Sequence, residues 1–290
     1  MKTLISTDTS AVLNYDVCKK NGLSVFALNV IIDGEEFLDG ITIDQKTLCE
    51  AMRSDKNIKT STPPLGEVIE YFEKLFAEGY DQIIHFTISS KLSSMNDLFK
   101  NVATNYFPNK LFVVDSYALS TVMLSQVLFA SEEVKKNRPV EEILNDIEDY
   151  KKFSSVVFIP ENLTALRNGG RISPAIAMIG NVLGIKPVIS LTDGELKKEG
   201  TTKQVRKHMI ETTVAMQEQF PVSDYDYSLV NFDARQEVVD YISKAISEIV
   251  GENKLITGIL PINVCAHCGP GTIGLVISKK INGKSIKDFL

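Results

Sequence analysis

The sequence has no long hydrophobic run, no basic block and no pattern typical of a secretory signal. No apolar run reaches the ~18 residues that cross a bilayer, so we expect no integral membrane segment. Residues 1–13 lack a basic start followed by an apolar core, which argues against a secretory signal and predicts a cytoplasmic protein with reduced cysteines. The net charge is -6 and Lys and Arg are not clustered, which argues against nucleic acid as a partner. These absences favour a small ligand.

Familiar catalytic motifs are missing as well. The chain lacks Gly-x-Ser-x-Gly, His-Glu-x-x-His, a Gly-x-x-x-x-Gly-Lys-Ser/Thr loop and a Gly-x-Gly-x-x-Gly fingerprint. Hydroxyl groups are plentiful, but no base is visibly paired with a nucleophile. A non-catalytic binding protein therefore fits the sequence better than an enzyme.

What the chain does contain is a regular alternation of predicted strands and helices. With 290 residues, 44% of them hydrophobic and 23% charged, it is long enough for two globular domains. In the first half the alternation favours a mainly parallel sheet flanked by helices. After Lys186 a strand, the turn Thr192-Asp193-Gly194 and a returning strand indicate antiparallel pairing. We predict an α/β protein with an N-terminal α/β domain at 1–152 and a C-terminal α/β domain with a mixed or antiparallel sheet at 153–290.

Local signals add detail to this outline. Residues 24–32 read as one long strand, followed by Asp33-Gly34 as a hairpin turn. Thr62 suits the N-cap of a helix with Pro63 in its first turn. Ser173-Pro174 predicts the start of another helix, which extends to about Leu183.

Three hydroxyl-bearing turns each precede a predicted helix, at Thr7 to Ser10, Thr60 to Thr62 and Ser89 to Ser94. In an open α/β sheet such turns converge at one edge, where helix N-termini offer N–H groups to an anion. The alternative is that these residues are only N-caps, which Ser, Thr and Asp commonly form. None of the turns supplies a strongly charged clamp, so the anion would carry little charge.

The stretch Cys265–Ile277 has the composition of a site. It places a histidine, two cysteines and three glycines between two predicted strands. The other histidines, His85 in a strand and His208 in a helix, are expected to be structural. Cys265 and Cys268 could form a redox or metal pair, although no further metal ligands stand at suitable spacing, so we expect no metal and no cofactor.

Arg171 lies in Asn168-Gly169-Gly170-Arg171, between a helix end and a helix start. Two consecutive glycines allow close backbone approach, which favours a site. A glycine helix stop followed by a surface arginine is the structural alternative.

Several segments taken together resemble the DegV family, whose members bind fatty acids. No single segment is decisive, but their order and spacing span the chain. The matching segments are Ser6 to Ser10, Lys59 to Pro63, Ile88 to Ser93, Gly169 to Ser173, Ile185 to Pro187 and His267 to Gly271.

The resemblance implies a two-domain protein that buries a long-chain fatty acid, such as palmitate, stearate or oleate, with its carboxylate at the domain junction. Some family members present this carboxylate to a separate ATP-binding fatty acid kinase subunit, which forms an acyl phosphate for phospholipid synthesis. Transient membrane contact is compatible with that role. By motif the carboxylate ligands fall on Thr60, Ser61, Ser93 and His267, while Arg171 corresponds to an arginine beside the head group that engages the partner.

The chain departs from the family pattern at three places. Ser-Ser-Gly-Leu-Ser-Gly is here Ser-Ser-Lys-Leu-Ser-Ser, which adds Lys91 near the head group. The family's Thr-Ser-Gln-Pro is replaced here by Thr-Ser-Thr-Pro. The family's His-Thr-Gly is replaced by His-Cys-Gly, with Cys268 in place of the threonine. An aliphatic tunnel has the composition of core, so the sequence does not locate its lining.

Three alternatives remain open at the sequence level. One is a serine hydrolase that uses Ser93 with His267. Another is a thiol oxidoreductase that uses Cys265 and Cys268. The third is a fatty acid carrier that acts without any kinase.

Overall fold

The computed structural model of the 290-residue chain describes residues 1–11, 15–172 and 184–290. The helix predicted from Ser173 to Leu183 lies outside these residues. Within the described part of the chain, no helix is both long and apolar enough to cross a membrane.

The first sheet is entirely parallel, as the sequence predicted. Its strand order is β2-β1-β6-β7. The strands are β2 (Ser24–Phe26), β1 (Thr3–Asp8), β6 (Gln82–Thr87) and β7 (Leu111–Asp115). One face packs on the helices α3 (Leu65–Ala77) and α4 (Met95–Tyr106). The other face packs on α5 (Ser120–Lys135) and α6 (Val140–Tyr150), so both faces of the parallel sheet are covered.

The second sheet is mixed and belongs to the C-terminal half. Its strand order is β10-β9-β8-β13-β11-β12, and only the β11–β12 pair is parallel. The strands are β8 (Ser154–Ile159), β9 (Lys186–Thr192), β10 (Glu195–Thr202), β11 (Tyr225–Phe232), β12 (Ile256–Ile259) and β13 (Thr272–Lys279). The helices α9 (Val205–Met216) and α10 (Gln236–Val250) cover one face. The mixed C-terminal sheet predicted from the sequence is thus confirmed.

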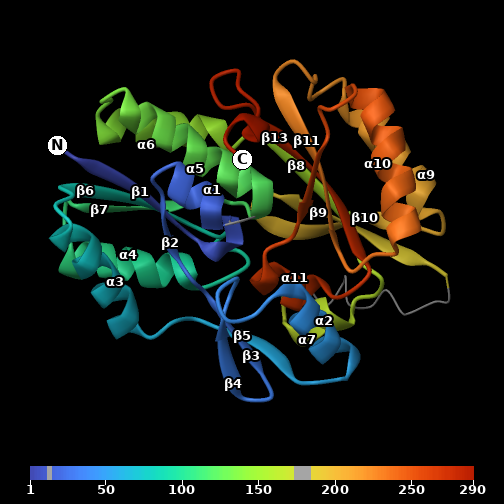
Figure 1. Ribbon diagram of the computed structural model, residues 1–290, viewed down its shortest axis with the longest axis horizontal. Coiled ribbons are helices and arrows are strands. Elements are labelled where there is room, and N and C mark those ends of the chain that lie inside the picture. The colour runs from blue at the N-terminus through green and yellow to red at the C-terminus, as the bar shows by residue number, and fades with distance from the viewer. Residues whose placement is uncertain (12–14, 173–183) are drawn as a thin grey trace.

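Helix α5 lies between the two large sheets and contacts both β1 and β13. Figure 1 shows the parallel sheet on one side of α5 and the mixed sheet on the other. Twelve of its sixteen residues are buried, including the polar ones at its start, because neither long face meets solvent. The largest hydrophobic cluster therefore joins the halves, with Ile84 of β6 and Val276 of β13 both in it.

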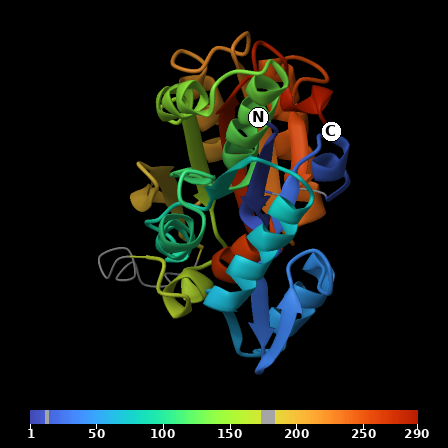
Figure 2. The ribbon, with the colours of Figure 1, turned by 90° about the vertical axis from the view of Figure 1, so that its left-hand side faces the viewer.

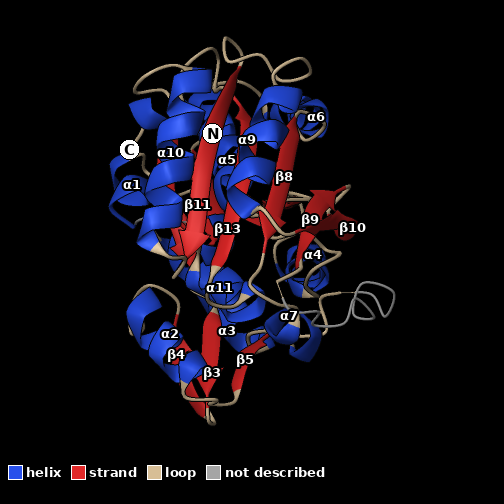
Figure 3. Ribbon diagram, turned by 90° about the vertical axis from the view of Figure 1, so that its right-hand side faces the viewer, coloured by secondary structure: helices blue, strands red, loops and turns tan. Residues whose placement is uncertain are grey.

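A small third sheet lies at the foot of the molecule, below the helix α11 (Ile262–Cys268), as Figures 2 and 3 show. Its order is β4-β3-β5, with β3 (Asn29–Ile32), β4 (Glu35–Leu38) and β5 (Ile58–Ser61), and the helix α2 (Gln45–Arg53) packs beside it. The hairpin turn at Asp33-Gly34 is confirmed, with φ of 51° and 93°.

The single strand predicted over residues 24–32 is wrong. The chain forms β2 in the parallel sheet and then β3 in the small one. Leu28, which lies between β2 and β3, pairs with a strand of neither sheet. Its N–H donates to the Thr9 hydroxyl at 3.2 Å, and its carbonyl accepts from the Asp39 N–H at 2.9 Å. The continuous apolar pattern carried no sign of this change of sheet.

The predicted helix start at Thr62 and Pro63 is also wrong. Helix α3 begins at Leu65 with Pro64 at the N-cap. Since Pro63 precedes another proline, the α conformation is disfavoured at Pro63, and the helix begins after the second ring. The Thr62 hydroxyl bonds instead to the Ser94 hydroxyl at 2.9 Å.

Candidate ligand-binding site

An apolar cavity lies where the three sheets meet. It encloses about 1110 Å³ of space not filled by atoms, its open mouth included. One wall is the face of the mixed sheet, with Val156, Phe158 and Val276. The opposite wall comes from the N-terminal half and includes Ile88 and Leu92. Most of the lining is apolar, which suits a hydrocarbon chain.

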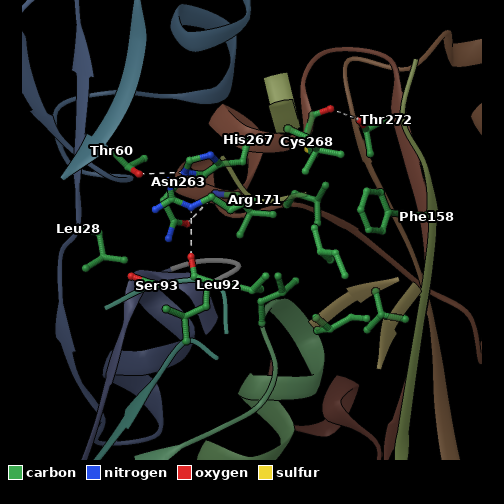
Figure 4. Close-up of a pocket in the computed structure, with 18 of the residues that line it drawn as sticks. Leu28, Thr60, Leu92, Ser93, Phe158, Arg171, Asn263, His267, Cys268 and Thr272 are labelled. Atoms are coloured by element: carbon green, nitrogen blue, oxygen red, sulfur yellow. Dashed lines mark hydrogen bonds between the residues drawn. The ribbon is translucent and has the colours of Figure 1, made fainter. Parts of the chain in front are cut away.

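The polar residues gather at one end of this cavity, where Thr60 of β5 meets His267 of α11 (Figure 4). The Thr60 hydroxyl and His267 Nε2 are 2.9 Å apart. Burial, reinforced by the nearby Arg171 cation, lowers the pKa of His267 to about 4, so the imidazole is neutral near pH 7. A neutral imidazole carries one N–H, and one proton of the Thr60–His267 pair is used in the bond between the two side chains. If Nε2–H donates to the Thr60 oxygen, the Thr60 hydroxyl proton is free to donate to a carboxylate.

Arg171 supplies a positive charge at the same end. Its Nε donates to the Leu92 carbonyl at 3.2 Å, and Nη1 donates to the Gly169 carbonyl. Figure 4 shows the guanidinium between the Thr60–His267 pair and Leu92. Among the described residues Arg171 has no carboxylate partner, and burial lowers its pKa. An unpaired cation that is partly buried attracts an anion.

Ser61 and Ser93 complete the polar end. Ser61 is the last residue of β5 and lines the cavity next to Thr60. Ser93 lies in the turn between β6 and α4, where its hydroxyl oxygen accepts from the Met95 N–H at 3.3 Å. The Ser93 hydroxyl proton is therefore available to a ligand. All the residues expected to hold a carboxylate line this one cavity.

The first hydroxyl turn has a different position from the other two. Residues 7–10 are fully buried behind the cavity and do not line it. Asp8 accepts from the N–H groups of Ser10 at 2.7 Å and Ile88 at 2.8 Å. The turn therefore holds the end of β6, from which the Ser93 loop departs.

Asn263 at the start of α11 is a lining residue that the sequence did not reveal. Its N–H donates to the Asp39 carboxylate at 3.0 Å, and its side-chain amide donates to the Ser10 hydroxyl at 2.7 Å. These contacts tie α11, and hence His267, to two distant parts of the N-terminal half. Because the partners are more than 220 residues apart, no local spacing could indicate them.

The stretch Cys265–Ile277 was expected to be a turn between two strands, and that expectation is partly wrong. Residues 262–268 form α11, and only Gly269 to Gly271 make the turn before β13. Gly269 and Gly271 have φ of 79° and 85°, a conformation that favours glycine.

The two cysteines of α11 lack the features of a redox pair. Cys265 and Cys268 are both buried, and burial raises the pKa of the Cys265 thiol. A reactive thiol needs a lowered pKa and access to its partner. Among the described residues no group of His, Cys, Asp or Glu side chains is arranged to hold a metal ion.

A hydrolase based on Ser93 and His267 also lacks its geometry. Within the described chain, the hydrogen-bond partner of His267 Nε2 is Thr60, and His267 Nδ1 has none. The Ser93 oxygen accepts from the Met95 N–H, which leaves the Ser93 proton without an acceptor among the described residues. In the part of the chain that the structure describes, no base is positioned to activate Ser93, as nucleophilic catalysis requires.

His85, Lys91 and His208 lie outside the lining of the cavity. His85 is fully buried in β6, stacks on Phe99 and bonds through Nδ1 to the Ser6 hydroxyl at 2.9 Å. Lys91 is exposed beside the Ser93 loop.

A second, more polar groove lies on the outer side of the Thr60–His267 pair. It encloses about 1710 Å³, its open part included. Thr60, Arg171, His267 and Cys268 line both this groove and the apolar cavity. These shared residues form a thin wall between the polar end of the cavity and the outer groove.

Three sheets around an apolar cavity with a polar, cationic end define an α/β protein with an amphipathic cavity. The chain belongs to the DegV family, because the family profile described as "Uncharacterised protein, DegV family" matches residues 2–280.

Individual relatives are similar over nearly the whole chain. A DegV domain-containing protein from Mycoplasmopsis pulmonis is 28% identical over 279 residues, which are 96% of each chain. A DegV family protein from Thermus thermophilus, whose solved structure is described as showing fatty acid binding, is 24% identical to this chain. The two structures align with a TM-score of 0.85 over 96% of this chain and 100% of the other. A stearic acid-binding protein from Eubacterium ventriosum is 21% identical with a TM-score of 0.84 and covers 97% of this chain and 99% of its own. At these identities the solved structures show a shared fold.

Proposed function

We propose that this protein binds a long-chain fatty acid in the apolar cavity and holds its carboxylate at the Thr60–His267 end. The observation that carries the proposal is the Arg171 cation, which has no carboxylate partner among the described residues, at the polar end of a mainly apolar cavity. The fatty acid binding of the Thermus thermophilus and Eubacterium ventriosum relatives supports it.

The free energy of binding would come mainly from the hydrocarbon chain. Each buried methylene contributes about 0.8 kcal/mol, so palmitate, stearate or oleate gains on the order of 10 kcal/mol before the cost of association. Charge-assisted hydrogen bonds from Ser61, Ser93 and the Thr60–His267 pair contribute less and fix which end of the acid lies at the polar wall. No cofactor or metal takes part in this binding.

The test is direct. The purified protein is denatured and extracted with solvent, and the extract is analysed by mass spectrometry, while delipidated protein is titrated with stearate and with octadecanol. We expect co-purified fatty acids and tighter binding of stearate than of octadecanol. The proposal is wrong if no fatty acid is extracted and added stearate does not bind.

We further propose that the protein presents the bound carboxylate to a separate ATP-binding kinase subunit. The outer groove, which shares Thr60, Arg171 and His267 with the cavity, supports this because a partner seated there would lie next to the carboxylate. The kinase would transfer the γ-phosphoryl group of ATP to the carboxylate, giving an acyl phosphate and ADP. A cytoplasmic carrier that supplies acyl phosphate for phospholipid synthesis, with transient membrane contact to collect its lipid, fits this role.

Trapping the product tests the presentation step. Stearate-loaded protein is incubated with ATP, hydroxylamine and fractionated cell extract, since hydroxylamine converts an acyl phosphate into a stable hydroxamate. We expect a stearoyl hydroxamate that requires both ATP and the loaded protein, and we expect Arg171→Ala to reduce its yield more than it reduces stearate binding. Stearate binding without any hydroxamate would identify a carrier that acts without a kinase.

A further inference from the structure

Asn29 is a polar residue within an apolar segment. It has the only polar side chain between Val25 and Ile32, and asparagine is depleted in strands. It is the first residue of β3, the middle strand of the small sheet. Its side chain is only 9% exposed, and it lines the apolar cavity. The stability of the strand does not explain an asparagine at this position.

The side-chain amide of Asn29 has no hydrogen-bond partner among the described residues. Buried polar side chains in native proteins are nearly always hydrogen-bonded, so an exception calls for an explanation. Asn263, the other asparagine in the described lining, differs in this respect. Its amide donates to the Ser10 hydroxyl at 2.7 Å, and its oxygen accepts from the Val264 N–H at 2.9 Å. The N–H groups and the carbonyl oxygen of the Asn29 amide are therefore available to a ligand in the cavity.

Ser61 lies directly across from Asn29 in the small sheet. The two residues are register partners in the antiparallel pair of β3 and β5, so their side chains stand on the same face, with Cβ atoms roughly 5 Å apart. Ser61 also lines the cavity, and in the part of the chain that the structure describes its hydroxyl has no hydrogen-bond partner. Two available polar groups thus lie side by side in the wall of the cavity.

Asn29 and Ser61 lie on a different face of the small sheet from the Thr60–His267 pair. Successive side chains of a strand point to opposite faces, so Thr60 and Ser61 leave β5 in opposite directions, although both line the cavity. The end of β5 therefore offers hydrogen-bond donors on two sides.

The face that carries Asn29 is held close to the loop that carries Ser93. The Thr62 hydroxyl, at the end of β5, bonds to the Ser94 hydroxyl at 2.9 Å. Leu28, which precedes Asn29, lies at the same end of the cavity as Ser93 (Figure 4). Asn29 is thus placed near the residues expected to hold the carboxylate.

We propose that Asn29 and Ser61 form a second pair of donors for the carboxylate, and that Asn29 contributes to the preference for a carboxylate over a neutral head group. This inference rests on the proposed fatty acid binding and adds a specificity-determining residue to it. A carboxylate has about four lone-pair sites, so it can accept from this pair as well as from Thr60 and Ser93. A neutral amide supplies its hydrogen bond without a second buried charge, whose desolvation would be unfavourable.

The experiment measures affinities for stearate, octadecanol and octadecylamine in delipidated parent protein, Asn29→Leu and Asn29→Asp. Asn29→Leu removes the amide at similar volume. We expect stearate affinity to fall about tenfold and octadecanol affinity to fall much less, because a hydrogen bond to a charged group is roughly twice as strong as a neutral one. Asn29→Asp keeps the shape but places a carboxyl group beside that of the ligand. Stearate affinity should then fall about a hundredfold, while octadecylamine should bind more tightly than it does to the parent.

Two further variants separate a head-group contact from an effect on packing. Asn29→Thr keeps a hydrogen-bond donor in a residue that suits a strand, so it should retain the preference for stearate over octadecanol that Asn29→Leu weakens. Asn101→Asp, on the exposed side of α4, is the matched control for the added charge and should bind all three ligands as the parent does. Circular dichroism checks the fold of each variant, and Asn29→Asp, which keeps the shape of the side chain, is decisive if Asn29→Leu does not fold.

Unchanged stearate affinity in Asn29→Leu and Asn29→Asp overturns the inference, as does an equal loss of affinity for stearate and octadecanol in both folded variants. In those cases the parent still binds stearate and the proposed function stands. If the parent binds no stearate, the proposed function and this inference fall together.

Discussion

At the polar end of the cavity, different side chains supply the hydrogen-bond donors and the positive charge that an anion needs. His267 is neutral, Thr60 bonds to it, and Arg171 provides the charge. A neutral donor beside a cation can bind a carboxylate without a second buried charge, whose desolvation would be costly. The orientation of the ligand therefore depends on a few hydroxyl and imidazole donors.

We expect Thr60→Val to weaken stearate binding while keeping the shape of the wall. Losing one hydrogen bond to a charged group costs roughly 1.5–3 kcal/mol, which is about tenfold or more in affinity. Calorimetric titration of delipidated protein measures the change, and Thr104→Val, on the exposed side of α4, is the control. Equal affinities of Thr60→Val and the parent would show that the hydroxyl does not contact the ligand.

Asp39 predicts a specific pH dependence of stability. Burial raises the pKa of Asp39 from 3.8 to about 6, so the folded state holds this proton more tightly than the unfolded state. The contribution of Asp39 to the free energy of unfolding is therefore greatest below pH 4 and is lost as the pH rises through 6. Relative to the parent, Asp39→Asn should gain up to about 3 kcal/mol between pH 4 and pH 7.

Urea denaturation followed by circular dichroism measures this difference at several pH values. Glu73→Gln, a neutral replacement on the exposed side of α3, should follow the parent at every pH. The two buried histidines oppose Asp39 in the parent, but they are present in both proteins and cancel in the comparison. Parallel curves for Asp39→Asn and the parent would contradict the raised pKa.

At the scale of elements, the short helix α11 decides where His267 lies. Its first turn is held by Asp39 through the Asn263 N–H. Its last turn packs on the helix α7 (Thr164–Asn168), which ends at Gly169. A seven-residue helix has little stability by itself, so these contacts define its position.

Gly169→Ala should displace His267 and weaken stearate binding. Gly169 has φ of -74°, which alanine adopts freely, but its Cβ would overlap His267 Nδ1. Overpacking of this kind costs about 1–3 kcal/mol or shifts the ring, so we expect a loss of affinity of tenfold or more. The imidazole NMR signals of His267 would report the displacement.

Gly66→Ala in α3 is the matched control, since no atom lies within 4 Å of an added Cβ there. It should raise the free energy of unfolding by about 0.5–1 kcal/mol, because alanine suits a helix better than glycine, and should leave binding unchanged. If Gly169→Ala binds stearate as the parent does, the packing of α7 on His267 is not needed for the site.

At the scale of the whole molecule, the cavity belongs to both halves of the chain. The division predicted at residues 1–152 and 153–290 falls between α6 and β8, and it stays a prediction. The largest hydrophobic cluster crosses that boundary, as does the bond from the Ser89 hydroxyl to the Gly194 carbonyl at 2.7 Å. A ligand in the cavity would contact both halves at once.

We therefore expect a single cooperative unfolding transition that moves as a whole when stearate binds. At a hundredfold excess over Kd, binding adds about 2.7 kcal/mol and raises Tm by roughly 5 °C for a chain of this size. Differential scanning calorimetry of delipidated and loaded protein measures the shift, and octadecanol should give a smaller one. Two transitions, only one of them shifted by stearate, would place the ligand within one half.

Much of this arrangement could be predicted because it depends on local pattern. The alternation of strands and helices gave the parallel and mixed sheets, and Asp33-Gly34 gave its hairpin, since residues a few positions apart determine these elements. The helix α11 was missed because seven residues are too few to show a helical repeat of apolar side chains. His267 was identified as a candidate only because glycines and cysteines stand next to it in the sequence.

What the sequence by itself determined is the class of fold, the family resemblance and the candidate head-group residues Thr60, Ser61, Ser93, Arg171 and His267. Only the tertiary structure decided that these residues meet at one end of an apolar cavity and that Asn263 and Asp39 hold α11. The reason is physical: a cavity is the space left between side chains from distant segments. Its lining has the same composition as the core, so only the packing of the three sheets distinguishes the two.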